Sequence, residues 1–220
     1  QAVPRRQAVR ARMTTFQKIC DVETEIKETR INDAKVDPYG GIVFGTYNEH
    51  PVRKNRKPIA SLYRLAPDLS LTQLLSNITV SNGIAFSQEE NIMYFADTPT
   101  ARIQKFEYSQ DFKKLHELDS NLIFNDVGVP DGATMDCQNN YWSARVRGNC
   151  IICIDMKKEK ILKKFNLPTN TPTCLTFGGP DSSNLFVTSL RAEPINDSAD
   201  GNLYKVETNT KGSKQLLSEI

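Results

Sequence analysis

The sequence predicts an all-β fold, and two observations lead to this prediction. The apolar runs are short and are separated by Gly, Pro, Asn and Asp, which favour turns between strands. No long segment keeps the 3.6-residue period of an amphipathic helix, although Phe16–Thr29 is left open between helix and irregular structure. We expect strands at Ile42–Gly45, Leu62–Leu65, Ile92–Ala96, Ile103–Tyr108, Asn140–Ala144, Cys150–Ile154, Leu185–Ser189 and Leu203–Val206.

An internal repeat indicates how these strands are grouped. Four polar residues stand in equivalent positions, 50, 49 and 42 residues apart, each ahead of a short strand: Asn32, Asn82, Asp131 and Thr173. The unit is most complete in Val129–Ala144, which also holds the only tryptophan, Trp142. Short strands repeated every 40 to 50 residues or so are typical of the blades of a β-propeller.

The repeat also suggests a site. In a propeller the innermost strand of each blade lines the central channel, so Asn32, Asn82 and Asp131 would come from three successive blades to one point on the axis. The alternative is that Asn and Asp only begin turns at these positions. The repeat positions alone do not decide between the two interpretations.

Composition predicts one soluble domain and no nucleic-acid partner. With 39% hydrophobic and 25% charged residues, the 220-residue chain is an ordinary globular sequence. The net charge of +2 depends on Arg5, Arg6, Arg10 and Arg12, without which 24 basic residues face 26 acidic ones. A nucleic-acid-binding surface needs its basic residues on a folded face rather than in a tail.

The domain boundaries and the compartment are expectations of the same kind. We expect residues 1–12 to be a basic disordered tail or leader, and residues 13–220 to form the folded domain. No apolar run is long enough for a membrane helix, and the N-terminus lacks the apolar core of a signal peptide. We therefore expect a cytoplasmic protein that has no membrane partner.

The five cysteines predict reduced thiols rather than a disulfide framework, because their number is odd and small. Cys150 and Cys153 have the spacing of a zinc or redox pair, but they lie in a predicted strand. Residues three apart in a strand point to opposite faces. We therefore interpret both as buried structural thiols, and Trp142 as part of a blade core.

Taken together, the motifs resemble the SMP-30/gluconolactonase/luciferin-regenerating-enzyme family of six-bladed propellers, about four blades of which are visible here. The resemblance covers the chain from about Phe16 to its end. It rests on Arg30-Ile31-Asn32-Asp33 with Lys35-Val36-Asp37-Pro38, Gly45-Thr46, Ser81-Asn82-Gly83, Pro130-Asp131-Gly132, Trp142 with Ala144, Pro172-Thr173-Cys174, Phe177-Gly178-Gly179-Pro180, Val187-Thr188-Ser189 and Gly201-Asn202-Leu203-Tyr204.

The resemblance implies a metal-dependent hydrolase of sugar lactones. Family members hold one divalent metal at the channel mouth, and the matching ligands here are Asn82 and Asp131. Oxygen ligands suit calcium, magnesium or manganese, and zinc is tolerated. Asp131 would also accept the proton of the attacking water, while Arg30 and Asn32 would bind the lactone. The alternative function is a non-catalytic propeller that binds calcium or a small ligand.

Three departures qualify this expectation. Ala34 stands where the family has glycine, and Glu49 is the nearest carboxylate to the family's acidic substrate contact, shifted by one position. The third departure is the largest, because the family's glutamate ligand lies upstream in a Glu-x-Pro context that this chain lacks. We therefore expect weak metal binding, low or no lactonase activity, and unpaired strand edges at the ends of an incomplete ring.

Overall fold

The predicted short strands are present in the structure, a computed structural model that describes residues 17–109, 111–112, 114–191 and 199–220. Residues 1–12, the expected tail, lie outside this part. The strands are β1 (Thr29–Val36), β2 (Ile42–Asn48), β3 (Ala60–Leu65), β4 (Leu71–Ile78), β5 (Ser81–Ser87), β6 (Ile92–Asp97), β7 (Arg102–Tyr108), β8 (Leu115–Ile123), β9 (Val129–Met135), β10 (Tyr141–Val146), β11 (Cys150–Asp155), β12 (Lys160–Asn166), β13 (Pro172–Gly178), β14 (Asn184–Ser189) and β15 (Leu203–Glu207). Three short 3-10 turns connect strands: η1 (Arg53–Asn55), η2 (Thr98–Thr100) and η3 (Asn125–Val127).

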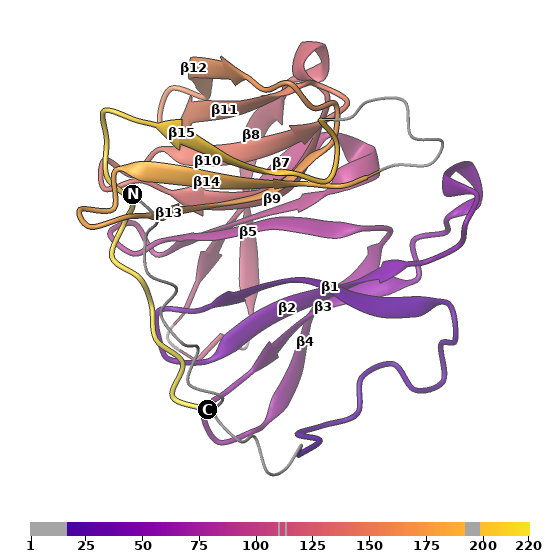
Figure 1. The fold of residues 1–220 in the computed structure, drawn as a ribbon. Helices are drawn as coiled ribbons and strands as arrows, with labels where there is room; N and C mark the ends of the chain where they lie inside the picture. The colour runs from indigo at the N-terminus through magenta and orange to yellow at the C-terminus, as the bar shows by residue number, and fades with distance from the viewer. Residues whose placement is uncertain (1–16, 110, 113, 192–198) are drawn as a thin grey trace, which may run out of the picture.

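The strands form four antiparallel sheets, one for each predicted repeat (Figure 1). We name them blade 1 (β1–β4), blade 2 (β5–β8), blade 3 (β9–β12) and blade 4 (β13–β15), and in each the strands follow chain order. The first strands lie next to one another, β5 beside β1 and β9, and β13 beside β9. This arrangement confirms an all-β chain of four propeller blades.

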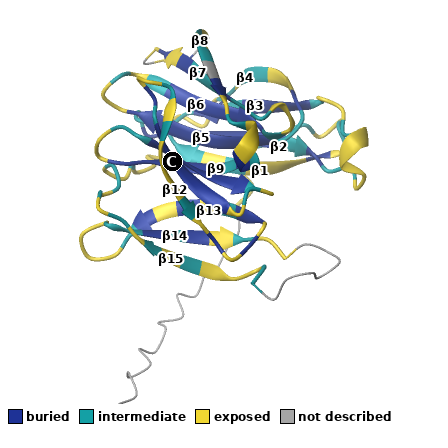
Figure 2. Ribbon diagram, turned by 90° about the horizontal axis from the view of Figure 1, so that it is seen from above, coloured by how far each residue is buried: buried dark blue, intermediate teal, exposed yellow. Residues whose placement is uncertain are grey.

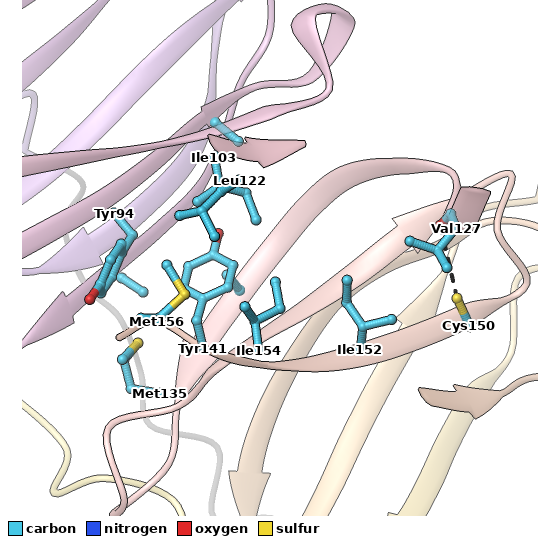
Figure 3. Close-up of a cluster of buried hydrophobic side chains, with 13 residues drawn as sticks. Tyr94, Ile103, Leu122, Val127, Met135, Tyr141, Cys150, Ile152, Ile154 and Met156 are labelled. Atoms are coloured by element: carbon cyan, nitrogen blue, oxygen red, sulfur yellow. Dashed lines mark hydrogen bonds between the residues drawn. The ribbon is translucent and has the colours of Figure 1, made fainter. Parts of the chain in front are cut away.

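Apolar side chains fill the spaces between neighbouring blades. One cluster joins blades 2 and 3, where Tyr94 and Tyr141 meet edge to face (Figure 3). Similar clusters join blade 1 to blade 2 and blade 3 to blade 4. Every residue of β5 is buried, whereas the outer strand β15 alternates between exposed and half-buried residues (Figure 2). Burying this apolar surface is the main driving force that holds the blades together.

The cysteine and tryptophan predictions are confirmed. Cys150 and Cys153 are free, buried thiols, and they face different clusters, one on each side of β11. Trp142 is fully buried, stacks on Phe165 and donates its indole N–H to Asp136 Oδ2 at 3.0 Å. All three side chains therefore serve the packing between blades.

The structure resolves what the sequence left open between Phe16 and Thr29. The described residues 17–28 form turns rather than a helix. Glu23 anchors this segment to blade 1, because its Oε1 accepts hydrogen bonds from the hydroxyls of Thr46 and Tyr63, each at 3.0 Å. Across the described residues, no helix is long and apolar enough to cross a membrane.

The C-terminal segment, residues 208–220, contacts all four blades beyond the C-terminal ends of their innermost strands, away from Asn82. It bonds to Ser182 in blade 4, pairs Gly212 with Asp136 in blade 3, and accepts a hydrogen bond from Gln88 in blade 2. It ends beside Gly40 in blade 1, whose carbonyl accepts the N–H of Glu219 at 2.9 Å. Figure 1 shows this yellow segment running from blade 4 to blade 1.

Candidate functional site

A β-bulge stands at the same place in the innermost strand of each blade. The ladder register shifts between Ile31 and Ala34, between Asn82 and Ala85, and between Pro172 and Leu175. In β9 the shift falls opposite Ser143 and Arg145, so it includes Asp131 and Gly132. A bulge bends a strand and changes the direction of a side chain. The four polar residues of the repeat, Asn32, Asn82, Asp131 and Thr173, therefore lie at equivalent bulges.

The structure brings Asn32, Asn82 and Asp131 together. Asn32 donates through Nδ2 to Asn82 Oδ1 at 3.0 Å and to the carbonyl of Ser81 at 2.8 Å. The Asn82 Oδ1 atom lies 3.0 Å from Oδ1 of Asp131. Three successive blades therefore supply polar side chains to one point, and the alternative of separate turn residues does not describe them.

Thr98 connects Asn82 to the strand that carries Asp131. The Asn82 Nδ2 donates to Thr98 Oγ1 at 2.8 Å, and the Thr98 hydroxyl donates to the carbonyl of Pro130 at 2.8 Å. Thr98 is held in turn by its own N–H, which donates to the carbonyl of Val80 at 3.0 Å. This hydroxyl therefore spans blades 2 and 3 directly beside the predicted ligands.

Two orientations of the Asn82 amide fit the same atomic positions. In the one just described, two acceptor oxygens, from Asn82 and Asp131, face each other at 3.0 Å with no hydrogen between them. Exchanging the amide oxygen and nitrogen would let the nitrogen donate to Asp131 at 3.0 Å and to the carbonyl of Ser81 at 3.1 Å, but would turn it toward Asn32 Nδ2. The first orientation needs a proton or a cation beside the oxygen pair; the second needs neither.

The environment of Asp131 favours a bound positive charge. Burial of the carboxylate raises the pKa of Asp131 to about 7, and the negative charge of Asp33 adds to the effect. The Gly132 N–H and the guanidinium of Arg53, in η1, oppose it. Desolvation also raises the pKa of Asp33, although its oxygens accept the N–H groups of Ala34 and Ile84 at 2.9 and 3.1 Å. A carboxylate whose burial outweighs its nearby counter-charges holds a proton or a cation readily.

The donor chemistry at this point fits a hard divalent cation in part. Asn82 and Asp131 present one amide oxygen and one carboxylate oxygen, which are typical ligands of calcium, magnesium and manganese. Among the described residues no three His, Cys, Asp or Glu side chains group as a metal site. The pair therefore fits as two members of a larger ligand set.

Arg30 and Glu49, the other predicted substrate contacts, pair with each other. The Arg30 guanidinium lies 2.8 Å from Glu49 Oε1, and the side chains are 56% and 37% exposed. Arg30 also donates to the carbonyls of Thr29 and Lys27. An exposed pair of this kind contributes little to stability, so both side chains are available to a ligand.

Sequence reasoning missed three residues beside the predicted ligands. Asp33 carried a signal, because it is the neighbour of Asn32 in the repeated motif and its position is polar. Thr98 and Arg53 carried none, since a threonine after a strand and an arginine in a loop are common. Only the blade geometry brings them to the site.

Gly83, next to Asn82, is a position where a side chain does not fit. Its φ is +66°, and an added Cβ would lie 2.5 Å from the hydroxyl of Tyr141, which donates to the Gly83 carbonyl at 2.8 Å. We expect Gly83→Ala to lower the free energy of unfolding by about 1–3 kcal/mol, from backbone strain and overpacking. Urea denaturation measures this, with Gly201→Ala as the control for a positive φ (+81°) without such a close contact. Equal losses in the two variants would contradict the packing assignment.

Comparison with known proteins shows which family the chain is similar to. The family model described as "SMP-30/Gluconolactonase/LRE-like region" matches residues 4–191. A Bacillus subtilis protein, named provisionally as a sugar lactone lactonase, is 31% identical over 90% of this chain and 68% of its own length. The chain spans 56% to 68% of the length of eight curated relatives that it matches.

Two solved structures are similar to this fold. A luciferin-regenerating enzyme superimposes with a TM-score of 0.85 at 29% identity, over 94% of this chain and 71% of that chain. The calcium-binding protein regucalcin of Agrobacterium tumefaciens superimposes with a TM-score of 0.80 at 25% identity, over 90% of this chain and 68% of that one. Since the family model also matches most of the sequence, the chain belongs to the SMP-30/gluconolactonase/LRE-like family.

Proposed function

We propose that this chain carries the cation-binding and catalytic residues of a sugar-lactone hydrolase. The observation that carries the proposal is the convergence of the Asn82 side-chain amide and the Asp131 carboxylate, 3.0 Å apart, beside the desolvated carboxylate of Asp33. The names of the family and of the Bacillus subtilis relative support a lactone as the substrate class. The four blades would correspond to four of the six in the family's ring.

Asn82 and Asp131 would hold a single divalent cation, calcium, magnesium, manganese or zinc. When bound, such an ion would polarise the lactone carbonyl and lower the pKa of a nearby water. Among the described residues no three His, Cys, Asp or Glu side chains form a metal site, so we propose that this chain binds the ion weakly and turns over slowly. Dissociation constants near 10⁻⁴–10⁻³ M are known for weak calcium sites with few ligands or little rigidity.

Asp131 would act as the general base. Its carboxylate is half-buried at the point where the repeat side chains meet, and it would take one proton from water while the water oxygen bonds to the lactone carbonyl carbon. The ring C–O bond would then break, and the leaving alkoxide would take that proton back from Asp131, which gives the open hydroxy acid and restores the carboxylate. Asn32 would orient the substrate from blade 1, and Arg30 with Glu49 would contact its hydroxyls.

A non-catalytic, calcium-binding propeller is the second candidate function. It is favoured by the two-member ligand set and by the similarity to the calcium-binding regucalcin structure. The two functions share the cation and differ in turnover. Measuring lactone turnover, rather than cation binding, therefore distinguishes the two functions.

A lactonase assay tests the proposal. We expect the purified chain to hydrolyse glucono-1,5-lactone faster than the uncatalysed rate when calcium or manganese is added at millimolar concentration, and to lose this stimulation in EDTA. The rate is followed by acid release in a weakly buffered indicator solution. Cation binding without any stimulated hydrolysis, across several sugar lactones, would favour the second function.

A further inference from the structure

We propose that the Thr98 hydroxyl is the positioning residue that turns the Asn82 amide oxygen, rather than its nitrogen, toward Asp131. This inference rests on the proposed function, because that orientation is the one a cation can use. Nothing in the family motif assigns a role to Thr98. It follows β6 in the short turn η2 and enters the site only through the fold.

The direction of each hydrogen bond follows from chemistry at the two ends of the chain Pro130–Thr98–Asn82. The carbonyl of Pro130 only accepts, so its 2.8 Å hydrogen bond with Thr98 uses the single hydroxyl hydrogen. Oγ1 can then only accept from Asn82, which must present its Nδ2 at 2.8 Å. The amide oxygen is therefore left on the side of Asp131.

Asn32 fixes the same orientation from the other side. Its Nδ2 donates to the carbonyl of Ser81 at 2.8 Å, and this identifies the group facing Asn82 as a donor. Asn82 must therefore present its oxygen to that donor, and Asn32 Nδ2 lies 3.0 Å from Asn82 Oδ1. Two anchors from different blades thus agree. The opposing preference comes from Asp131 and the Ser81 carbonyl, which would each accept from the nitrogen of an exchanged amide.

The size of the effect on cation affinity follows from counting the hydrogen bonds of the Thr98 hydroxyl in the two orientations of the Asn82 amide. With the oxygen toward Asp131, the Thr98 hydroxyl takes part in two hydrogen bonds, to Pro130 and from Asn82. With the amide exchanged, it takes part in one, to the Asn82 oxygen. Removing the hydroxyl therefore costs the cation-ready orientation one hydrogen bond more than its competitor. One such bond corresponds to a roughly three- to tenfold change in an equilibrium constant.

The test is the affinity of the full chain for manganese alone, measured by water-proton relaxation, in three variants. We expect Thr98→Val to bind roughly three- to tenfold more weakly and Thr98→Ser, which keeps the hydroxyl, to stay within about twofold of the wild type. Thr100→Val is the matched control, because its hydroxyl bonds to the Asp97 carbonyl within the same turn. Urea unfolding of all three shows whether they are folded. Unchanged affinity in a folded Thr98→Val variant would overturn the inference.

A second readout separates this inference from the proposed function. In the ¹⁵N-labelled wild type, nuclear Overhauser effects from the Asn82 amide protons should reach the Thr98 methyl rather than the Asp131 β-protons. The opposite pattern in manganese-free, calcium-saturated protein would contradict the role of Thr98 even if metal binds. If the wild type binds neither ion, the proposed function fails, and the Overhauser pattern in the ion-free chain alone decides the orientation.

Discussion

Replacing Asp131 with asparagine should stabilise the ion-free chain and abolish the stabilisation that a divalent cation gives. In EDTA above the pKa of about 7, we expect Asp131→Asn to raise the free energy of unfolding by about 1–3 kcal/mol. This change in free energy is smaller than the full pKa shift would give, because the side chain is only half-buried and solvent screens its charge. At saturating calcium the wild type should gain about 1–3 kcal/mol, and the variant should gain none.

The pH dependence follows from the same shift. The folded-state pKa of Asp131 is raised from the ordinary 3.8 to about 7, so the folded chain binds a proton that the unfolded chain releases. The stabilisation that comes from this bound proton is complete below about pH 4 and is lost as the pH rises to about 7. Thermal unfolding in EDTA across this range measures it. Asp119→Asn, at an exposed carboxylate, is the control, and equal pH profiles for wild type and Asp131→Asn would contradict the assignment.

Arg64→Met is expected to be the most destabilising single change outside the site. Arg64 Nε lies 2.6 Å from Asp37 Oδ2, and the two side chains are 8% and 0% exposed. Asp37 also accepts the N–H groups of Tyr39 and Gly41, which close the turn between β1 and β2. Removing the arginine leaves a buried charge without its counter-ion, which costs about 3–5 kcal/mol.

The double variant Asp37→Asn with Arg64→Met shows whether charge is the cause. The neutral amide keeps an oxygen for the turn and removes the unpaired charge, so we expect it to recover a large part of the loss. Urea unfolding of both single variants and the double variant forms a double-mutant cycle. If the double variant is as unstable as the sum of the single variants, the ion pair is not the source of the effect. The guanidinium over the Phe112 ring would then be the more important contact.

The sequence predicted the centre of each blade better than its edge. The strands at Ile92–Ala96 and Cys150–Ile154 were predictable because they are buried on both faces and therefore uniformly apolar. The outer strand β12 (Lys160–Asn166) is mostly exposed and lysine-rich, so no apolar run marks it. Its backbone pairing with β11 defines it instead.

The same contrast holds at the candidate site. Asn32, Asn82 and Asp131 could be found because equal spacing along the chain becomes equal placement around an axis. Thr98 could not, because its role depends on which atoms of Asn82 and Pro130 lie within reach across two blades. The pairing of Arg30 with Glu49 also depends on strand register, since Arg30 lies opposite Tyr47 in the β1–β2 ladder.

A manganese titration followed by NMR shows whether Asn82 and Asp131 hold a divalent cation. Paramagnetic broadening reports weak sites and identifies the nearest nuclei. We predict that the signals of Asn82, Asp131 and Gly132 broaden first, at a low ratio of metal to protein, and that Asp131→Asn abolishes this. Broadening that begins at the surface carboxylates and leaves these three signals sharp would show that no cation binds between Asn82 and Asp131.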